Sequence, residues 1–155
     1  MDIYLDKVTA DQKNTLFNLL QYSLFEESAT DGNEIGEDGT FAYKFFDRYF
    51  IEPDRLAFFI REKDSDKLLG FAMINTYMQH SESGHSIAEF MILPKYRHQK
   101  IGKKAAFLCF DLFDGNWKIS PSLGSKSAFA FWKKVISEYS NDSAELIDGI
   151  FCFRR

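Results

Sequence analysis

Residues 87–108 read IAEFMILPKYRHQKIGKKAAFL, an apolar segment that runs into a basic turn and then into an amphipathic segment. The turn reverses the local charge, because no Asp or Glu lies between Glu89 and Asp111 while the whole chain has a net charge of −4. Five basic side chains fall within ten residues: Lys95, Arg97, Lys100, Lys103 and Lys104. Apolar side chains then recur with helical spacing at Ile101, Ala105, Leu108 and Leu112. The stretch therefore predicts a buried strand, a basic turn and a helix.

The basic turn is predicted to bind a small anion. The first N–H groups of a helix have no partner within the helix, and the helix dipole favours an anion there by roughly 0.3–1 kcal/mol. Lysines at that end of a helix are unfavourable unless an anion is bound, which also indicates a ligand. The alternative is a solvated basic helix start beside an ordinary buried strand. A pI near 5.4 argues against general nucleic-acid binding.

The bulk composition indicates one globular domain over residues 1–155. The chain is 45% hydrophobic and 17% aromatic, which is enough for one core. No apolar run approaches the roughly 20 residues of a membrane span, and the first residues lack a signal-peptide pattern, so we expect a cytoplasmic protein without membrane contact. Cys109 and Cys152 lie in apolar surroundings and are expected to be free thiols rather than a disulfide. The spacing of His, Cys and carboxylate residues matches no metal site.

Hydrophobic periodicity predicts the order β-α-α-β-β-β-α-β-α-β-β. Strands are expected near residues 3–8, 56–61, 68–78, 86–93, 117–120, 144–147 and 150–153. Helices are expected over residues 9–27, 41–50, 101–114 and 128–139, with a loop over 28–40 and turns over 63–67 and 80–84. We expect an α/β (α+β) fold, with a mixed, mostly antiparallel sheet of about seven strands flanked on both faces by about four helices.

The basic turn resembles a known ligand-binding loop. Residues 96–103, YRHQKIGK, resemble the acyl-CoA pyrophosphate loop of the GNAT acetyltransferase superfamily, whose pattern is Arg or Gln, two residues, Gly, one residue, then Gly or Ala. Residues 91–94 resemble the fourth strand of that family. Residues 117–119 and 125–139 resemble its fifth strand and last helix. The resemblance covers the full order of elements and implies a single GNAT-like domain.

Three residues depart from the family pattern. Lys100 stands where the first loop glycine is usual; if that position needs a left-handed backbone, a non-glycine residue costs roughly 1–2 kcal/mol. Ser125 stands where Asn is usual near the pantetheine arm. Trp132 stands where many members place a Tyr that protonates the leaving thiolate, and an indole N–H is a donor that cannot act as this acid.

The resemblance implies transfer of an acetyl group from acetyl-CoA to an amine. Such an enzyme aligns a neutral amine with the thioester, removes a proton and stabilises the oxyanion. Backbone groups near Met91, Ile92 and Leu93 would hold the pantetheine and the thioester oxygen, and amides of 98–103 would cradle the pyrophosphate. The residues expected to bind CoA are Met91, Ile92, Leu93, Arg97, His98, Gln99, Lys100, Ile101, Gly102, Lys103, Ser125 and Trp132.

Glu89 is the leading candidate for the general base. It interrupts an otherwise apolar strand, where partial burial raises the pKa of a carboxyl, and alternation places it on one face with Met91 and Leu93. The alternative is a carboxylate that is paired with a basic residue or faces water. His80 and His85 are further candidates for the base. Tyr139 or Tyr77 could supply the acid, or no acid is needed because a CoA thiolate is a tolerable leaving group.

An acidic stretch precedes the aromatic segment of residues 41–50. No Lys or Arg occurs from Asn14 through Tyr43, and this part of the chain carries Glu26, Glu27, Asp31, Glu34, Glu37 and Asp38. In the family this region often borders the acceptor pocket, so it could attract a cationic amine; the alternative is a solvated loop. The aromatic side chains of 41–50 either line that pocket or belong to the core.

We therefore predict an N-acetyltransferase that moves an acetyl group from acetyl-CoA to a primary amine of a small molecule or peptide by direct transfer. One alternative is an acyl-CoA-binding module with weak or lost catalysis, which Lys100 and Trp132 suggest. A nucleic-acid-binding domain is a further alternative, disfavoured by the acidic charge. The acceptor and the oligomeric state stay open.

Overall fold

One mixed sheet forms the centre of the molecule. The computed structural model describes residues 1–78, 80–81 and 83–155. Its strands are β1 (Ile3–Lys7), β2 (Leu56–Glu62), β3 (Leu68–Asn75), β4 (His85–Ile92), β5 (Asn116–Ile119), β6 (Glu145–Ile147) and β7 (Ile150–Arg154). They lie in the order β1-β2-β3-β4-β5-β7-β6. Neighbouring strands are antiparallel except β4 and β5, which are parallel, so the prediction of a mixed, mostly antiparallel sheet is confirmed.

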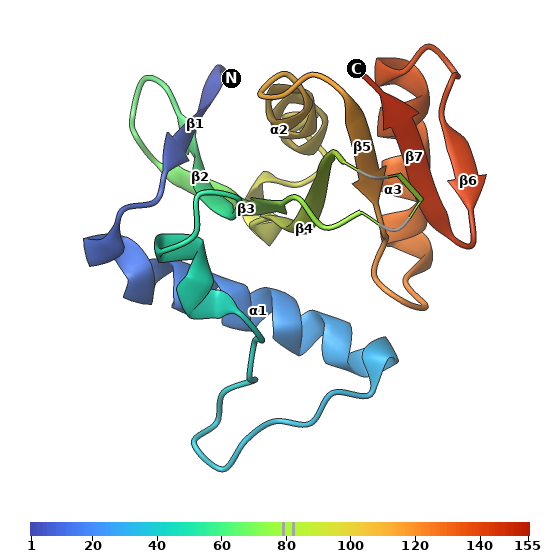
Figure 1. The fold of residues 1–155 in the computed structure, drawn as a ribbon. Coiled ribbons are helices and arrows are strands. Elements are labelled where there is room, and N and C mark those ends of the chain that lie inside the picture. Colours follow the sequence, from blue (N-terminus) through green and yellow to red (C-terminus); the bar gives the residue numbers. More distant parts are fainter. Residues whose placement is uncertain (79, 82) are drawn as a thin grey trace.

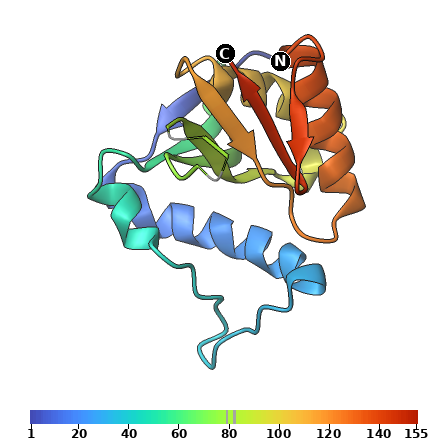
Figure 2. The same ribbon diagram turned by 45° about the vertical axis from the view of Figure 1, so that its right-hand side comes forward.

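Helices cover both faces of the sheet (Figures 1 and 2). The α-helices of the described residues are α1 (Lys13–Asp31), α2 (Ile101–Phe110) and α3 (Lys126–Tyr139). Short 3-10 helices occur at η1 (Ala10–Gln12), η2 (Phe46–Phe50) and η3 (Pro94–Tyr96). The aromatic helix predicted over 41–50 is thus reduced to η2, because Phe45 has a φ of 69° and interrupts helical geometry. α1 runs past its predicted end to Asp31, where Gly32 at φ 76° ends it.

Side chains on the two faces of the sheet form separate apolar clusters. One cluster joins the sheet to α2 and α3 and includes Phe110, Trp117 and Trp132. Another joins it to α1 and η2 and includes Leu16 and Phe71. The strands β2 and β3 are buried on both faces, which is why their sequences are nearly continuous apolar runs. The central strands therefore separate two environments, one on each side.

β4 pairs unequally with its two neighbours. It pairs with β3 along its length, but its pairing with β5 covers only the three residues from His85 to Ile87. A register shift sets Ile87 opposite Ile74 and Glu89 opposite Met73. This bulge places Ile87 with the α2 and α3 cluster, and Glu89 on the face of α1, where strict alternation would have put both on one side. Beyond Ile87 the edge of β4 facing β5 has no strand partner in the described chain.

The segment between β3 and β4 was predicted to contain a turn over residues 80–84, of which residue 82 lies outside the described residues. β3 ends at Asn75, three residues before the predicted end, and the Asn75 Oδ1 accepts a hydrogen bond from the Tyr77 amide at 3.0 Å. Asn116 Nδ2 donates to the Ser83 carbonyl at 3.1 Å. This hydrogen bond attaches the segment to the start of β5.

No helix in the described residues is both long and apolar enough to cross a membrane.

Candidate functional site

The turn from β4 to α2 has two residues in the left-handed backbone region. His98 has a φ of 62° and Lys100 a φ of 63°. Lys100 directly precedes α2, at the position where the family loop usually has a glycine. The left-handed conformation considered for Lys100 is therefore present, at a cost of about 1 kcal/mol. Successive backbone N–H groups in a turn can form a concavity that binds anions.

The amides of residues 98–103 are free to bind such an anion. In the described part of the chain, none of these six N–H groups donates to a protein acceptor, and the first helical bond at this end runs from the Lys104 amide to the Lys100 carbonyl at 3.2 Å. Pro94, at the first position of η3, and the exposed Lys95 precede them. Unpaired amides and lysines in one turn are the groups that a diphosphate needs.

Two of the side chains predicted to bind phosphate form ion pairs with carboxylates of the protein. Arg97 Nε donates to the Ile92 carbonyl at 2.8 Å, and Arg97 Nη2 lies 3.3 Å from Glu26 Oε1 on α1. Lys103 Nζ lies 2.5 Å from Glu138 Oε1, an ion pair that joins α2 to α3. These pairs are partly exposed and contribute little to stability. An anion bound at the turn would compete with Glu26 and Glu138 for the two cations.

The backbone groups of β4 point alternately toward β3 and toward the open edge of the strand. The Leu93 amide donates to the Leu69 carbonyl at 2.8 Å, so Leu93 is directed toward β3. In an antiparallel pair the backbone groups point to opposite sides at successive residues, which directs Met91 toward β3 and Phe90 and Ile92 toward the open edge. The backbone groups of Met91 and Leu93 are thus directed to the neighbouring strand and those of Ile92 to the open edge, and the contacts of all three residues to the pantetheine stay predictions.

The remaining predicted CoA contacts lie on or beside α3. Ser125 is the N-cap of α3, where its Oγ accepts a hydrogen bond from the Ala128 amide at 3.2 Å. Trp132 is only 7% exposed and lies in the aromatic cluster, with its ring 5.1 Å from that of Phe90. A Cβ on Gly102 would lie 2.9 Å from the Phe131 ring, so α2 and α3 approach closely at this glycine. The structure therefore gives Ser125 a capping role and Trp132 a packing role, and their contacts to CoA stay predictions.

Glu89 meets a second carboxyl group that sequence reasoning did not connect with it. Its side chain hydrogen-bonds with Glu27 of α1. Glu27 Oε1 in turn accepts hydrogen bonds from Ser122 Oγ at 3.3 Å and Ser23 Oγ at 3.5 Å. Burial raises the pKa of the Glu89 carboxyl well above its usual range, and the Glu27 charge raises it further. Burial also raises the pKa of Glu27.

Tyr43 completes this polar group between α1 and the sheet. Burial, followed by the negative charge of Glu89, raises the pKa of the Tyr43 hydroxyl, which therefore stays protonated and can donate. Tyr49 lies beside it, and the Tyr49 hydroxyl accepts a hydrogen bond from Asn75 Nδ2 at 3.3 Å. We call Glu27, Glu89 and Tyr43 the carboxyl cluster. Its three side chains are half-buried, and together they can hold and release a proton.

The other acid–base candidates lie elsewhere. His85 stacks on Phe113 at 3.9 Å, and burial lowers its pKa. His80 is exposed, as is Tyr77 at 63%. The Tyr139 hydroxyl donates to Asp111 Oδ1 at 2.7 Å and accepts from Arg155 Nε at 2.8 Å, at the C-terminal end of α3. Of the candidates, Glu89 is the one that the fold places in a buried polar group.

The signal for Glu27 is present in the sequence. α1 buries Leu16, Leu20 and Ser23 on one stripe, and Glu27 continues this stripe at i+4 from Ser23. An acid on the buried stripe of a helix is unusual and indicates a partner or a function. The local pattern does not reveal this role, because it predicts a helix end at Glu27 and groups Glu27 with an acidic loop.

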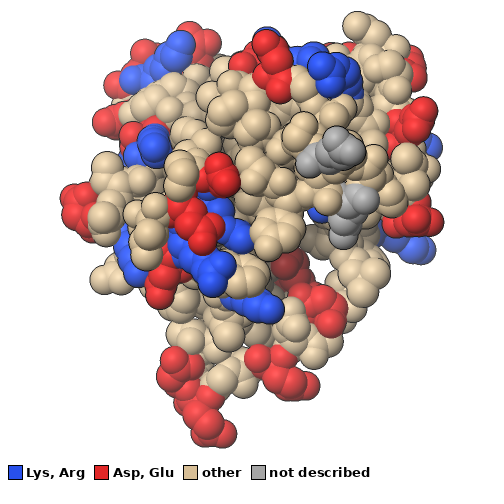
Figure 3. Space-filling model, in the orientation of Figure 1, with Lys and Arg blue, Asp and Glu red and all other residues tan. Residues whose placement is uncertain are grey.

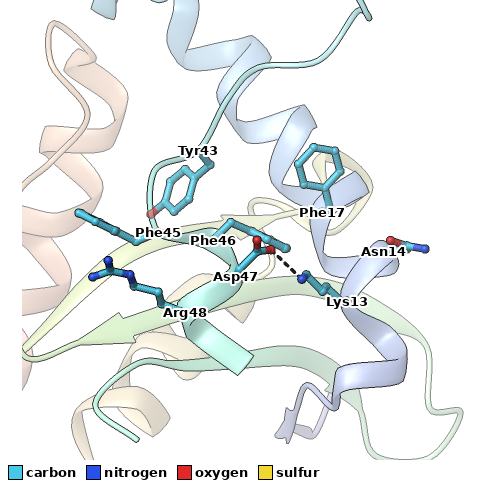
Figure 4. Close-up of a pocket in the computed structure, with 8 residues that line it drawn as sticks. All are labelled: Lys13, Asn14, Phe17, Tyr43, Phe45, Phe46, Asp47 and Arg48. Atoms are coloured by element: carbon cyan, nitrogen blue, oxygen red, sulfur yellow. Dashed lines mark ion pairs between the residues drawn. The ribbon is translucent and has the colours of Figure 1, made fainter. Parts of the chain in front are cut away.

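The aromatic segment contributes to the core and also lines a hollow, and the role of this hollow as an acceptor pocket stays a prediction. Phe41, Phe46 and Tyr49 are buried in the α1 cluster. Tyr43 and Phe45 instead line an open hollow of about 480 Å³ between α1 and η2 (Figure 4), together with Lys13, Asn14, Phe17, Phe46, Asp47 and Arg48. Lys13 Nζ pairs with Asp47 Oδ1 at 2.6 Å across it. In Figure 4 the Tyr43 hydroxyl points away from Phe17, so the ring lines the hollow while the hydroxyl belongs to the carboxyl cluster.

Acidic side chains gather at one end of the molecule. Figure 3 shows them at its lower end, where Figure 1 places the connector of residues 32–45. Of the six acids that were predicted to form a loop, Glu26, Glu27 and Asp31 belong to α1, and Glu34, Glu37 and Asp38 belong to the connector. Within the described residues, no group of three or more His, Cys, Asp or Glu side chains is placed to hold a metal ion.

Comparisons with solved structures find the same fold in acetyltransferases. An acetyltransferase from Thermus thermophilus is 15% identical, with a TM-score of 0.69 over 100% of this chain and 98% of that one. The aminoglycoside acetyltransferase AAC(6')-Ib in complex with coenzyme A is 9% identical, with a TM-score of 0.68 over 99% and 95%. The aminoglycoside 6'-N-acetyltransferase AAC(6')-Ih from Acinetobacter baumannii is 9% identical, with a TM-score of 0.60 over 86% and 89%.

No curated protein matches the chain. The model of the acetyltransferase (GNAT) family matches residues 21–119, a span that includes the second half of α1, β2 to β5 and the basic turn. Because this match covers more than half of its residues, the chain belongs to the acetyltransferase (GNAT) family and is an acyltransferase.

Proposed function

We propose that this protein transfers an acetyl group from acetyl-CoA to a primary amine of a small molecule or peptide. The observation that carries the proposal is the run of unpaired amides over 98–103, in a turn rich in lysine, beside the unpaired edge of β4. A diphosphate would be held by these N–H groups together with Lys100. The pantetheine arm would meet the backbone of Phe90 and the amide of Ile92, which point to that edge, since the Ile92 carbonyl already accepts from Arg97 Nε.

The carboxyl cluster supplies the proton acceptor for this reaction. The nitrogen of the neutral amine attacks the thioester carbon, the new N–C bond forms, and the C–S bond breaks so that CoA leaves as a thiolate. The proton lost by the nitrogen goes to the ionised carboxylate of Glu89, and the thiolate takes a proton from water. A base is most effective when its pKa lies near the working pH, and burial raises the pKa of Glu89 in that direction.

The acceptor that we propose is a cationic amine. The acids of α1 and the connector make this end of the molecule negative, and among the described residues from Asn14 through Tyr43 no Lys or Arg offsets them. A negative surface raises the local concentration of cations, and salt weakens this effect. The solved structures with this fold include aminoglycoside acetyltransferases, whose acceptors carry several amines.

A titration with acetyl-CoA, followed by a thiol-release assay over a panel of amines, tests the proposal. Binding with turnover is expected, and turnover with cationic amines should fall as ionic strength rises. Binding without turnover would instead support an acyl-CoA-binding module. Absence of CoA binding would refute the proposal.

Variants of the turn locate the binding site. Gly102→Glu is expected to abolish CoA binding through crowding and charge repulsion, with an unchanged far-UV CD spectrum. Because a Cβ alone would lie 2.9 Å from Phe131, Gly102→Ala is the matched control and should keep most of the affinity. Lys100→Glu reverses one exposed charge and should weaken binding by at least about tenfold, without a packing change.

Glu89→Gln tests the base. Loss of a general base typically costs about 10²- to 10⁴-fold in rate, so turnover should fall by this factor while CoA affinity is retained. Equal activity of the variant would remove Glu89 from the mechanism and leave the CoA site untouched.

A further inference from the structure

Three separate elements bring Glu27 against Glu89. Glu89 comes from β4, and the bulge before it turns its side chain toward α1. Glu27 comes from the last turns of α1, and Ser122 comes from the segment between β5 and α3. Contacts among residues so distant in the sequence exist only in the folded chain. The two carboxyl groups are therefore held together by the tertiary structure rather than by local sequence.

Glu27 is restrained on both sides. Ser23 Oγ, one helical turn earlier, donates to Glu27 Oε1 at 3.5 Å, and Ser122 Oγ donates to the same oxygen at 3.3 Å. Both donors stabilise a negative charge on Glu27. Glu89, in contrast, faces Met73 across the strand pair, and burial together with the Glu27 charge raises its pKa well above the usual range. The proton of the pair is therefore better placed on Glu89, which donates it to the Glu27 carboxylate.

The charges around the pair do not neutralise it. Asp31 lies one turn further along α1 and adds a negative charge, and Tyr43 and Tyr49 are neutral donors from the connector and η2. Lys118 of β5 is the register partner of Ser86 on β4, and Ser86 is also the register partner of Asn75 on β3. Lys118 therefore lies beside the start of β4 and not opposite Glu89. Glu89 has no ion-pair partner among the described residues. Two carboxylates this close cannot easily both be ionised, so they share one proton.

Resting on the function proposed above, we propose that Glu27 is a positioning residue for Glu89: the two carboxyl groups share one proton and titrate as a single unit in the transfer reaction. The first ionisation of the unit leaves one proton between the two groups. The second ionisation frees Glu89 to accept the proton of the amine. Glu27 therefore sets the pH above which the enzyme works, although it does not touch the amine itself.

The pH profile of turnover tests this proposal. The acid limb of the wild-type kcat profile should lie well above the ordinary range of a glutamate. Glu27→Gln keeps the hydrogen bond with Ser122 but removes the second charge, so Glu89 should ionise more easily and the limb should move to lower pH by about one unit or more. An acid limb that stays in place or moves to higher pH would overturn the proposal.

Two further variants separate charge from structure. Ser122→Ala removes a donor to Glu27 without removing a charge, so it should move the limb less than Glu27→Gln does. Glu145→Gln removes a matched charge from the exposed strand β6, away from the acidic connector, and should leave the limb unchanged. If Glu145→Gln shifted the limb as much as Glu27→Gln, the effect would come from general charge, and the pairing would be refuted.

A measurement without turnover keeps the two proposals distinct. In protein with ¹³C-labelled glutamate carboxyls, the Glu89 signal, assigned from its loss in Glu89→Gln, should titrate at higher pH than exposed glutamates, and this pH should fall in Glu27→Gln. That result would support the pair even if no amine were acetylated. An unshifted Glu89 titration in a protein that does acetylate amines would overturn the pairing alone.

Discussion

The two faces of the sheet differ in what they bury. On the face of α2 and α3, the cluster around Phe110 and Trp117 is apolar, and both side chains are fully buried. On the face of α1, an apolar cluster of similar extent surrounds the polar side chains of Glu27, Glu89 and Tyr43. Buried apolar groups add stability, whereas paired buried acids reduce it and give a site its chemistry. The comparison places the apolar core on one face and the proposed proton acceptor on the other.

Breaking the apolar face should have the largest effect on stability. Phe110 is fully buried, and its ring lies 4.9 Å from Phe153 and 5.3 Å from Trp117. Phe110→Ala leaves a cavity that cannot fully close and should lower the free energy of unfolding by about 3–5 kcal/mol. Urea unfolding measures this change. Phe25→Ala, at a site that is 68% exposed on α1, is the control and should change stability by less than about 0.5 kcal/mol.

The polar face should make stability depend on pH. A raised Glu89 pKa in the folded state means that the unfolded state releases its proton first as the pH rises. Stability is therefore highest below the usual pKa of glutamate and falls by about 1.4 kcal/mol per pH unit until the folded-state pKa is reached. Unfolding at pH 5 and at pH 7.5 should show this fall in the wild type and a smaller fall in Glu89→Gln. Equal slopes in the two proteins would mean that Glu89 titrates normally.

The turn between β4 and α2 extends the comparison, because there a strained backbone coincides with the proposed CoA site. Lys100 has a φ of 63°, so Lys100→Gly should stabilise the protein by about 1 kcal/mol while weakening CoA binding. Lys133→Gly removes a matched exposed lysine from the interior of α3 and should instead destabilise by about 1 kcal/mol. Urea midpoints and a CoA titration distinguish these outcomes. Destabilisation by Lys100→Gly would show that the left-handed backbone costs nothing here.

The reactivities of the two cysteine thiols should test, without any substitution, how readily the folded protein opens. Cys109 of α2 is fully buried in the apolar cluster, and burial raises its pKa to about 12. Cys152 of β7 is half-buried, and burial raises its pKa as well. With a thiol reagent at neutral pH, Cys152 should react in the folded protein and Cys109 only after unfolding. Rapid reaction of Cys109 would mean that the α2 face opens readily.

Much of the fold and the binding turn could be predicted from local pattern. The basic run from Lys95 to Lys104 depends on residues adjacent in the chain, and so do the apolar alternation of the strands and the helical spacing of α2. These signals are short-range, which is why seven strands in the predicted order and a left-handed Lys100 are found. The prediction of a helix over the whole aromatic segment 41–50 is wrong, because Phe45 has a positive φ that interrupts the helix whatever the spacing of apolar residues.

The sequence by itself determined the family, the glutamate on β4 and the basic turn, because each is encoded in the kind and spacing of neighbouring residues. Only the tertiary structure decided that Glu89 faces α1 and meets Glu27, and that the Leu93 amide is used by β3. These outcomes depend on a bulge and on the pairing of distant strands and helices. A carboxyl group gains a shifted pKa from the groups that surround it in space, and residues 62 positions apart in the chain carry no local sign of that contact.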